Sequence, residues 1–252
     1  MTKNVVITGA ASGMGLSDTK EFLEHGWNVV MADFNEKMGT EKALELQKKF
    51  PDSKIFFAKV DVSNAKSVSE LAKSAYQIFG SIDAIINNAG IFAPGALHEL
   101  EEKTWDRVMN IDVKSIYLMT KAFVPKMMDR EEGVIINTAS ISGLRGDYNM
   151  AAYSAAKGAV ANLVRSMALD YGKYGIRVNN IVPGPTNTPM FQKNPKEVIQ
   201  SFNNASPLGH VVEPEDIAKT VYFLASDNAK SITGQNIQVT AGFGIHSGQP
   251  VQ

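Results

Sequence analysis

The chain has 252 residues, 44% of them hydrophobic and 20% charged, so it can bury a sizeable core and is not a disordered chain. Its 25 Lys and Arg residues nearly balance 26 Asp and Glu, and the net charge of −1 argues against a nucleic acid or an anionic membrane as partner. The absence of cysteine excludes disulfides, thiolate metal ligands and a cysteine nucleophile, and the four scattered histidines form no zinc motif. We therefore expect no metal site.

The sequence contains no pattern typical of export or membrane insertion. The apolar run 5–7 near the start is too short for the core of a signal peptide. No other run approaches the roughly 18 apolar residues that cross a bilayer. The expectation is a cytoplasmic protein without a membrane partner.

Short β-branched runs alternate along the chain with longer stretches of helical periodicity. Runs that are apolar along their whole length are typical of parallel strands buried on both faces. Alternating strands and helices imply right-handed crossovers, and therefore an α/β fold with a doubly wound parallel sheet and helices on both faces. The predicted strands lie at 5–7, 29–32, 55–57, 82–86, 134–136 and 177–182.

One stretch interrupts this alternation. After Pro183-Gly184-Pro185, residues 186–214 are rich in Asn and Pro and carry little strand signal. They are predicted to be a mobile insertion over the sheet rather than a second domain. No repeat or flexible linker divides the chain, so residues 1–252 are interpreted as a single domain.

A glycine-rich segment, residues 8–15, follows the first predicted strand and opens a helix. Gly9, Gly13 and Gly15 let the backbone turn tightly and approach a pyrophosphate, and a helix N-terminus presents free N–H groups to anions. The spacing is neither G-x-G-x-x-G nor a Walker motif. Taken alone, the segment also fits a strand-to-helix turn without a ligand.

Asp33 strengthens the case for a dinucleotide. It ends the second predicted strand, where a Rossmann-type site places an acid on the ribose hydroxyls. A carboxylate repels a 2′-phosphate, and neither Ser12 nor Phe34 supplies the basic group that such a phosphate requires. NAD is therefore preferred over NADP, although Lys37 lies close enough to favour the other cofactor. The alternative is a solvated acid at a strand end.

Tyr153 and Lys157 stand four residues apart in an Ala-rich stretch that predicts a helix over about 150–171. Residues at i and i+4 share a helix face, so the phenol and the ammonium can point into one pocket. A nearby ammonium favours the phenolate, which would let the phenol exchange a proton with a substrate oxygen. As an isolated pair, they equally fit a solvated helix face.

Several short motifs follow one another in a set order along the chain. They are Thr8-Gly9-x-x-x-Gly13-x-Gly15, Asp61, Asn87-Asn88-Ala89-Gly90, Asn110, Ser140, Tyr153-x-x-x-Lys157 and Pro183-Gly184. In order and spacing this set resembles the short-chain dehydrogenase/reductase family, in its "classical" subgroup. The resemblance extends from Lys3 to about Gly242, and its specificity comes from the ordered set rather than from one motif.

The resemblance implies a catalytic set of four residues. Ser140, 13 residues before Tyr153, is expected to polarise the substrate carbonyl, and Tyr153 to act as general acid in reduction and base in oxidation. Lys157 is expected to hold the nicotinamide ribose and to assist ionisation of the tyrosine. Asn110 is expected to anchor a water in a proton relay.

The sequence and the resemblance together imply where NAD and the substrate bind. Thr188, together with Thr186, is expected to reach the nicotinamide carboxamide. The full set expected at the cofactor is Gly9, Ser12, Gly13, Met14, Gly15, Asp33, Phe34, Asp61, Val62, Asn88, Ala89, Gly90, Tyr153, Lys157, Pro183, Gly184, Thr186 and Thr188. The expected substrate pocket comprises Ser142, Leu144, Tyr148, Asn149, Met190 and Phe191. For Met190 and Phe191, packing within the insertion is an equal alternative.

The implied activity is the NAD(H)-dependent interconversion of a secondary alcohol and its ketone, and small ketones, diketones, cyclic alcohols, sugars and hydroxysteroids all fit as substrates. The resemblance also implies a homotetramer that associates through long helices around 104–129 and 150–172. One departure concerns this assembly: Thr240-Ala241-Gly242 stands where the family often has Asp-Gly-Gly, beside the sheet edge used in subunit packing.

The sequence also carries features of two other functions. Ser154-x-x-Lys157 and Ser226-Asp227-Asn228 match two motifs of penicillin-binding acyl transferases, but the third, K-T-G, is missing. The other rival is a dinucleotide-binding sensor or scaffold without turnover, since a fold alone does not define a function. The complete set of Asn110, Ser140, Tyr153 and Lys157 argues against that reading.

Overall fold

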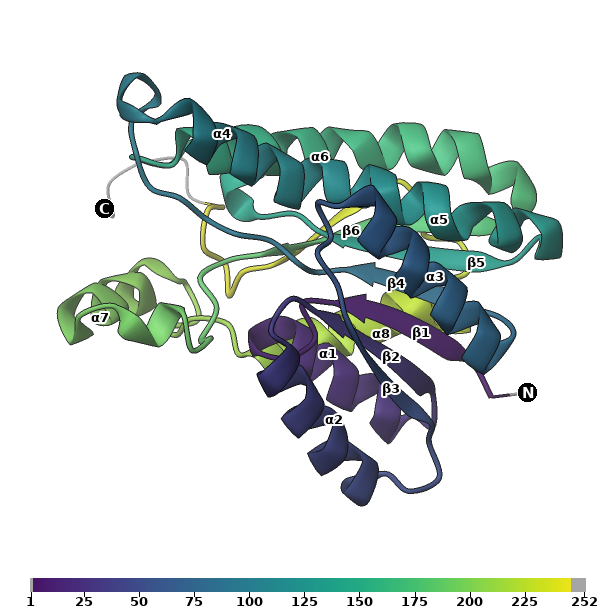
Figure 1. Cartoon of the computed structure of the whole chain (residues 1–252). Helices are drawn as coiled ribbons and strands as arrows, with labels where there is room; N and C mark the ends of the chain where they lie inside the picture. The colour runs from purple at the N-terminus through teal and green to yellow at the C-terminus, as the bar shows by residue number, and fades with distance from the viewer. Residues whose placement is uncertain (1, 246–252) are drawn as a thin grey trace.

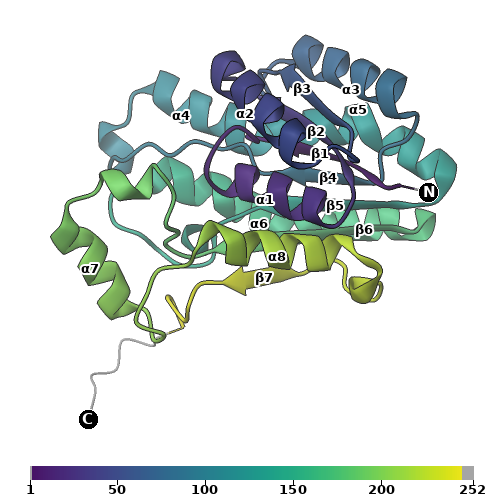
Figure 2. The ribbon, with the colours of Figure 1, turned by 90° about the horizontal axis from the view of Figure 1, so that it is seen from below.

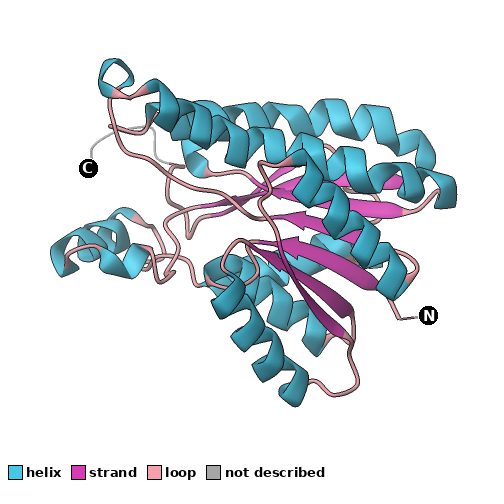
Figure 3. Ribbon diagram, in the orientation of Figure 1, coloured by secondary structure: helices cyan, strands magenta, loops and turns pink. Residues whose placement is uncertain are grey.

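The computed structural model describes residues 2–245, in which seven parallel strands form one sheet. The strand order is β3-β2-β1-β4-β5-β6-β7. Helices cover both faces of the sheet (Figure 3), which confirms the predicted doubly wound α/β fold. The strands are β1 Asn4–Thr8, β2 Asn28–Asp33, β3 Ile55–Lys59, β4 Ala84–Asn87, β5 Gly133–Thr138, β6 Ile176–Pro183 and β7 Asn236–Val239.

Six of these strands overlap the predicted apolar runs. β4 begins at Ala84, two residues later than its run, and the carboxylate of the preceding Asp83 accepts a hydrogen bond from the backbone N–H of Asn4 at 2.7 Å. β7 was not among the predicted runs. Its sequence Asn-Ile-Gln-Val is short, half polar and only partly buried, as expected for an edge strand.

The helices form two layers, one on each face of the sheet (Figures 1 and 2). Each layer has its own buried apolar core against the sheet. One layer holds α3 Ala65–Phe79, α5 Ser115–Arg130 and α6 Ala151–Tyr171, with α4 Glu102–Met109 packed on α6. The other holds α1 Gly13–Glu24, α2 Glu36–Lys49 and α8 Pro214–Ala225. None of the helices described is long and apolar enough to cross a membrane.

The strand order reverses between β1 and β4. Crossovers on either side of this point leave in opposite directions, so the carboxyl ends of the two strands border a crevice. The glycine-rich segment follows β1, and Asn88 follows β4. The topology therefore places both segments at the position where doubly wound sheets bind ligands.

A row of four asparagines, three buried and Asn236 partly buried, crosses the sheet from β4 to β7. The side-chain amides of Asn87, Asn137, Asn180 and Asn236 are linked in sequence by hydrogen bonds of 2.8, 3.1 and 2.8 Å. The last two also donate to backbone carbonyls of α6 at 3.0 and 2.9 Å. Because buried amides require partners, this row fixes α6, which carries Tyr153 and Lys157, relative to the sheet.

The predicted long helix over 104–129 is interrupted. α4 ends at Met109, a π-helical turn (η2, Asn110–Lys114) follows, and α5 begins at Ser115. A π turn carries an extra residue and therefore changes which side chains share a face; such turns are frequent at functional sites. The second helix, predicted over 150–172, is confirmed as α6.

The insertion 186–214 is more ordered than a loop. It contains a short 3-10 turn, η5 Phe191–Lys193, and α7 Lys196–Ala205. α7 stands away from the sheet (Figure 1). Its partly buried Ile199 and Phe202 lie three residues apart on one side, and the Phe202 ring packs edge-on against Phe191 at 5.5 Å between ring centres. Because the insertion is rich in Asn and Pro, its sequence did not predict the short amphipathic helix α7.

Asp18 is a buried acid of α1 whose carboxyl oxygen Oδ1 has no hydrogen-bond partner. Burial, and secondarily Glu21, raise the pKa of Asp18 well above its ordinary value. The folded protein thus holds a proton that the unfolded chain releases, and stability is lost as the pH rises above about 4, the unfolded value.

We therefore expect Asp18→Asn to raise the free energy of unfolding by about 1–2 kcal/mol at pH 7, and by much less near pH 4. Urea denaturation at both pH values measures the difference. An equal change at the two pH values would contradict the assignment.

Candidate active site

A cavity of about 1400 Å³ opens at the carboxyl ends of the strands. Most residues predicted for the cofactor and the substrate line it. They are Gly9, Ser12, Gly13, Met14, Asp33, Phe34, Asp61, Val62, Asn88, Ala89, Gly90, Asn110, Ser140, Ser142, Tyr148, Tyr153, Lys157, Pro183, Gly184, Thr186, Thr188, Met190 and Phe191. The fold thus gathers side chains from across the sequence into one site.

Three predicted residues do not line the cavity. Gly15 faces the backbone, and a Cβ there would lie 2.3 Å from the carbonyl oxygen of Gly9, so its role is close packing of helix on loop. Leu144 packs against the core formed by α3, α5 and α6. Asn149 has a positive φ of 55° and its carbonyl accepts from Gly95, so it serves as a turn residue. In this structure these three residues lie outside the lining of the cavity, and the contacts expected of them stay predictions.

The glycine-rich segment fits a pyrophosphate. Gly9 adopts a φ of +68°, and a Cβ on it would lie 2.9 Å from Asn88 Nδ2. Asn88 in turn donates to the Thr8 carbonyl at 3.0 Å and holds the loop against β4. Ser12, the N-cap of α1, makes no side-chain capping bond, so the first N–H groups of the helix stay available to an anion.

Asp33 is held in place at the end of β2. Its two carboxylate oxygens accept hydrogen bonds from the backbone N–H groups of Ala11 at 2.9 Å and Asn35 at 2.8 Å. Each oxygen keeps a second lone pair, so the carboxylate can still accept from a ribose diol. Phe34 beside it is 71% exposed and offers no positive charge to a phosphate.

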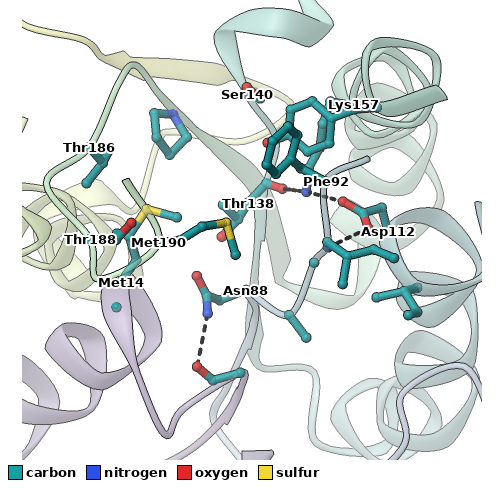
Figure 4. A pocket seen from close by; sticks show the side chains of 18 of the residues that line it. Met14, Asn88, Phe92, Asp112, Thr138, Ser140, Lys157, Thr186, Thr188 and Met190 are labelled. Atoms are coloured by element: carbon teal, nitrogen blue, oxygen red, sulfur yellow. Dashed lines mark hydrogen bonds and ion pairs between the residues drawn. The ribbon is translucent and has the colours of Figure 1, made fainter. Parts of the chain in front are cut away.

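Lys157 is buried at the centre of the site. Its ammonium donates to the carbonyl oxygen of Thr138 at 2.8 Å and lies 3.1 Å from Oδ2 of Asp112 (Figure 4). The nitrogen is 5.7 Å from the ring centre of Tyr153. Burial alone lowers the pKa of Lys157, but Asp112 and Tyr153 outweigh it, so that the pKa is raised. An ammonium has three N–H donors, which leaves one for another partner.

The acid beside Lys157 is Asp112, which the sequence analysis did not select. Asn110 lines the cavity but has no recorded hydrogen bond to Lys157, and its part in a proton relay stays a prediction. In a regular helix two residues spaced i and i+2 point to nearly opposite sides, whereas η2 lets both Asn110 and Asp112 border the cavity. The one sequence feature that points to Asp112 is its place between two apolar residues, in Ile-Asp-Val.

Gly90 packs closely on this ion pair. A Cβ at Gly90 would lie 2.9 Å from Oδ2 of Asp112 and 3.3 Å from Nζ of Lys157. Oδ1 of Asp112 accepts from the backbone N–H of Ile91 at 2.9 Å. The segment after β4 therefore packs directly on the charged pair.

Ser140 and Ser142 form the polar wall on the other side of Tyr153. Ser140 Oγ accepts from the backbone N–H of Ser142 at 3.2 Å, which caps the short turn η3 Ile141–Gly143. Ser142 Oγ donates to the carboxylate of Asp147, which also lines the cavity. Phe92 packs edge-on against Tyr153, with 6.3 Å between ring centres. Sequence reasoning missed Phe92 and Asp147, because both lie on loops without a motif.

The insertion forms the opposite wall of the cavity. Thr186, Thr188 and Met190 face Ser140, Lys157 and Phe92 across it (Figure 4). Aromatic residues Phe191, Phe202 and Phe243 extend this wall. The insertion therefore contributes both threonine hydroxyls and aromatic rings to the cavity, opposite the serines and Tyr153.

The doubly wound sheet and the glycine cradle at its reversal point place the chain among dinucleotide-binding Rossmann proteins. The family model described as enoyl-(acyl carrier protein) reductase matches residues 9–244. The chain belongs to this family of short-chain dehydrogenases/reductases, which are oxidoreductases.

Curated relatives match over nearly the whole chain. Meso-2,3-butanediol dehydrogenase of Serratia marcescens is 38% identical over 248 residues, covering 98% of this chain and 97% of that protein. The 2,5-dichloro-2,5-cyclohexadiene-1,4-diol dehydrogenase of Sphingobium indicum is 35% identical, covering 96% of each chain. A solved 7α-hydroxysteroid dehydrogenase complexed with NADH and 7-oxo glycochenodeoxycholic acid superposes with a TM-score of 0.92 at 30% identity, covering 96% of this chain and 94% of that one.

Proposed function

We propose that the protein is an NAD(H)-dependent oxidoreductase that interconverts a small secondary alcohol and its ketone. The observation that carries the proposal is the placement of Tyr153 and Lys157 in the same cavity as the glycine cradle and Asp33. The NADH-bound hydroxysteroid dehydrogenase supports the choice of cofactor. The exposed Phe34 and the anchored Asp33 support NAD over NADP.

Bound in the cavity, the nicotinamide supplies or accepts the hydride. The proposed role of Tyr153 is to give a proton to the ketone oxygen, or to remove one from the alcohol. Ser140 Oγ is proposed to donate a hydrogen bond to the same oxygen. Lys157, with one N–H donor left after Thr138 and Asp112, is proposed to hold the ribose and to favour the phenolate by its charge.

The test is a substrate screen with both cofactors. Purified protein is mixed with NADH or NADPH and a panel of ketones, diketones and hydroxyketones, and the reduced cofactor is followed by absorbance. Oxidation of NADH with at least one ketone supports the proposal. Tight NADH binding without turnover of any substrate would support the alternative of a redox sensor or scaffold.

The polar wall supports a narrower substrate class, in which a hydroxyl or keto group stands next to the reacting carbon. Ser142 and Asp147 adjoin Ser140, so a second oxygen of a small substrate can reach them while the first contacts Tyr153. A carboxylate accepts hydrogen bonds from alcohols and repels anionic substrates. Two of the relatives are named for diols.

We expect Asp147→Asn to lower kcat/KM for 2,3-butanediol by about tenfold, because a charged hydrogen bond to the second hydroxyl is lost. The same variant should oxidise 2-butanol at the wild-type rate. Steady-state kinetics on the two alcohols measure both values. Equal losses on the diol and the mono-alcohol would show that Asp147 does not read the second hydroxyl.

The expected homotetramer stays a proposal. Exposed Tyr117 on α5 and Leu169 on α6, 56% and 83% accessible, are available to an interface on those helices. Sedimentation velocity of the purified protein determines the assembly.

A further inference from the structure

Asp112 and Lys157 form a buried ion pair at the edge of the cavity. The Asp112 residue is 2% exposed and Lys157 is 4% exposed. Oδ2 of Asp112 accepts no hydrogen bond from another group in residues 2–245, and the ammonium lies 3.1 Å from it. Oδ1 is fixed by the backbone N–H of Ile91. One carboxylate oxygen of Asp112 is thus held by the backbone, and the other faces the ammonium of Lys157.

Few titratable groups act on this ammonium. They are Asp112 from η2 and Tyr153 from α6, and both raise the pKa of Lys157 against the opposing effect of burial. β5 contributes only the neutral carbonyl of Thr138, and the segment after β4 contributes Gly90 without a side chain. Among residues 2–245, Asp112 is therefore the carboxylate that contacts the ammonium of Lys157.

Loss of one proton from the Tyr153–Lys157 pair has two possible products. One is a phenolate beside an ammonium, and the other is a neutral phenol beside a neutral amine. The two forms contain the same number of protons, so their ratio is independent of pH. Only the first can accept a proton from an alcohol at Tyr153 and keep a positive charge at Lys157.

We propose that Asp112 is a positioning residue that keeps the proton on Lys157, so that Tyr153 is the group that ionises. The inference rests on the proposed use of Tyr153 as acid and base. A carboxylate in contact with the ammonium favours the charged lysine far more than it disfavours the phenolate, because Coulomb interactions weaken with distance. Without it, burial would drive the lysine toward its neutral form.

For Asp112→Asn, the proposal predicts the direction in which the pH–rate profile shifts. Removing a negative charge makes loss of the first proton easier from either group, so the acid limb of the rate profile for alcohol oxidation should move down by about one pH unit. At the same time, part of the enzyme that has lost one proton takes the form with a neutral phenol and a neutral amine, which cannot accept a proton at Tyr153. The plateau rate should therefore fall about tenfold. Asn keeps the shape and an oxygen that can accept from Ile91.

The control is Asp129→Asn, which removes the same charge from an exposed position on α5 outside the cavity. Its profile should coincide with that of the wild type. A lower plateau for Asp112→Asn without movement of the acid limb would show a structural role only and overturn the proposal, as would an unchanged profile. Thermal unfolding of each variant reports whether it folds.

A second measurement requires no substrate. The tyrosinate absorbance of the protein minus that of its Tyr153→Phe variant isolates Tyr153 among the seven tyrosines during a pH titration. The same difference is then measured with Asp112→Asn present in both proteins. The tyrosinate absorbance should begin to rise at lower pH, and its first rise should be smaller. Superimposable curves would overturn the inference. If the wild type oxidises no alcohol, the proposed function fails, whereas this titration still decides the role of Asp112.

Discussion

Replacing Tyr153 by Phe is expected to lower kcat for ketone reduction by about 10³-fold or more, while the Kd for NADH changes by less than about threefold. The substitution removes one oxygen and keeps the ring, which packs edge-on against Phe92. The glycine cradle and Asp33 are untouched, so the contacts proposed for the dinucleotide persist. Single-turnover absorbance measures the rate, and the fluorescence of bound NADH measures the affinity.

Tyr174→Phe is the matched control, because it removes the same atom from a partly exposed tyrosine that does not line the cavity. Wild-type turnover is expected for it. If Tyr153→Phe retained the wild-type rate, another group would be the acid, and the proposed role of the Tyr153–Lys157 pair would be lost. If it lost NADH binding as well, the phenol would serve the cofactor rather than the proton transfer.

The sheet was predictable because its strands are buried on both faces. Runs such as Val5-Val6-Ile7 and Val134-Ile135-Ile136 are apolar at every position, which is the pattern that a covered parallel sheet imposes. β7 lacks that pattern because it is a partly exposed edge. α7 escaped prediction for a related reason: its apolar face is narrow, and its Phe202 packs on the rings of Phe191 in the insertion and Phe243 after β7.

The site was predictable where spacing along one element decides geometry. Tyr153 and Lys157 share a face of α6 by their i, i+4 spacing, and Asp33 follows from its place at the end of β2. Asp112 was not predictable in this way. Its contact with Lys157 depends on a π turn that no sequence rule indicates, and on the missing side chain of Gly90.

Loop residues illustrate the same limit. Asp147 meets Ser142 because the chain folds back between η3 and α6, a path that the sequence Gly-Asp-Tyr-Asn does not specify. Asn149 and Leu144 were expected in the pocket because they lie between Ser140 and Tyr153, but one forms a turn with positive φ and the other packs inward. Proximity in sequence does not determine which way a loop side chain points.

Cofactor choice provides the second large effect, through Asp33 and its neighbour Phe34. The double variant Asp33→Ala, Phe34→Arg is expected to shift the ratio of kcat/KM for NADH to that for NADPH by about 10²- to 10³-fold toward NADPH. The carboxylate is held rigidly by two backbone N–H groups, so it cannot move away from a 2′-phosphate. Arg at an exposed position beside it supplies a planar donor group that fits a phosphate.

Two further variants separate charge from packing in this result. Asp33→Asn keeps an oxygen acceptor for the N–H of Ala11 but loses the charge, so it should admit NADPH without binding it tightly. Glu36→Gln removes an exposed acid nearby that pairs with Lys59 and should leave the ratio as in the wild type. An unchanged ratio in the double variant would mean that Asp33 does not contact the adenosine ribose. The cavity would then hold the dinucleotide in another orientation, with its pyrophosphate no longer at the N-terminus of α1.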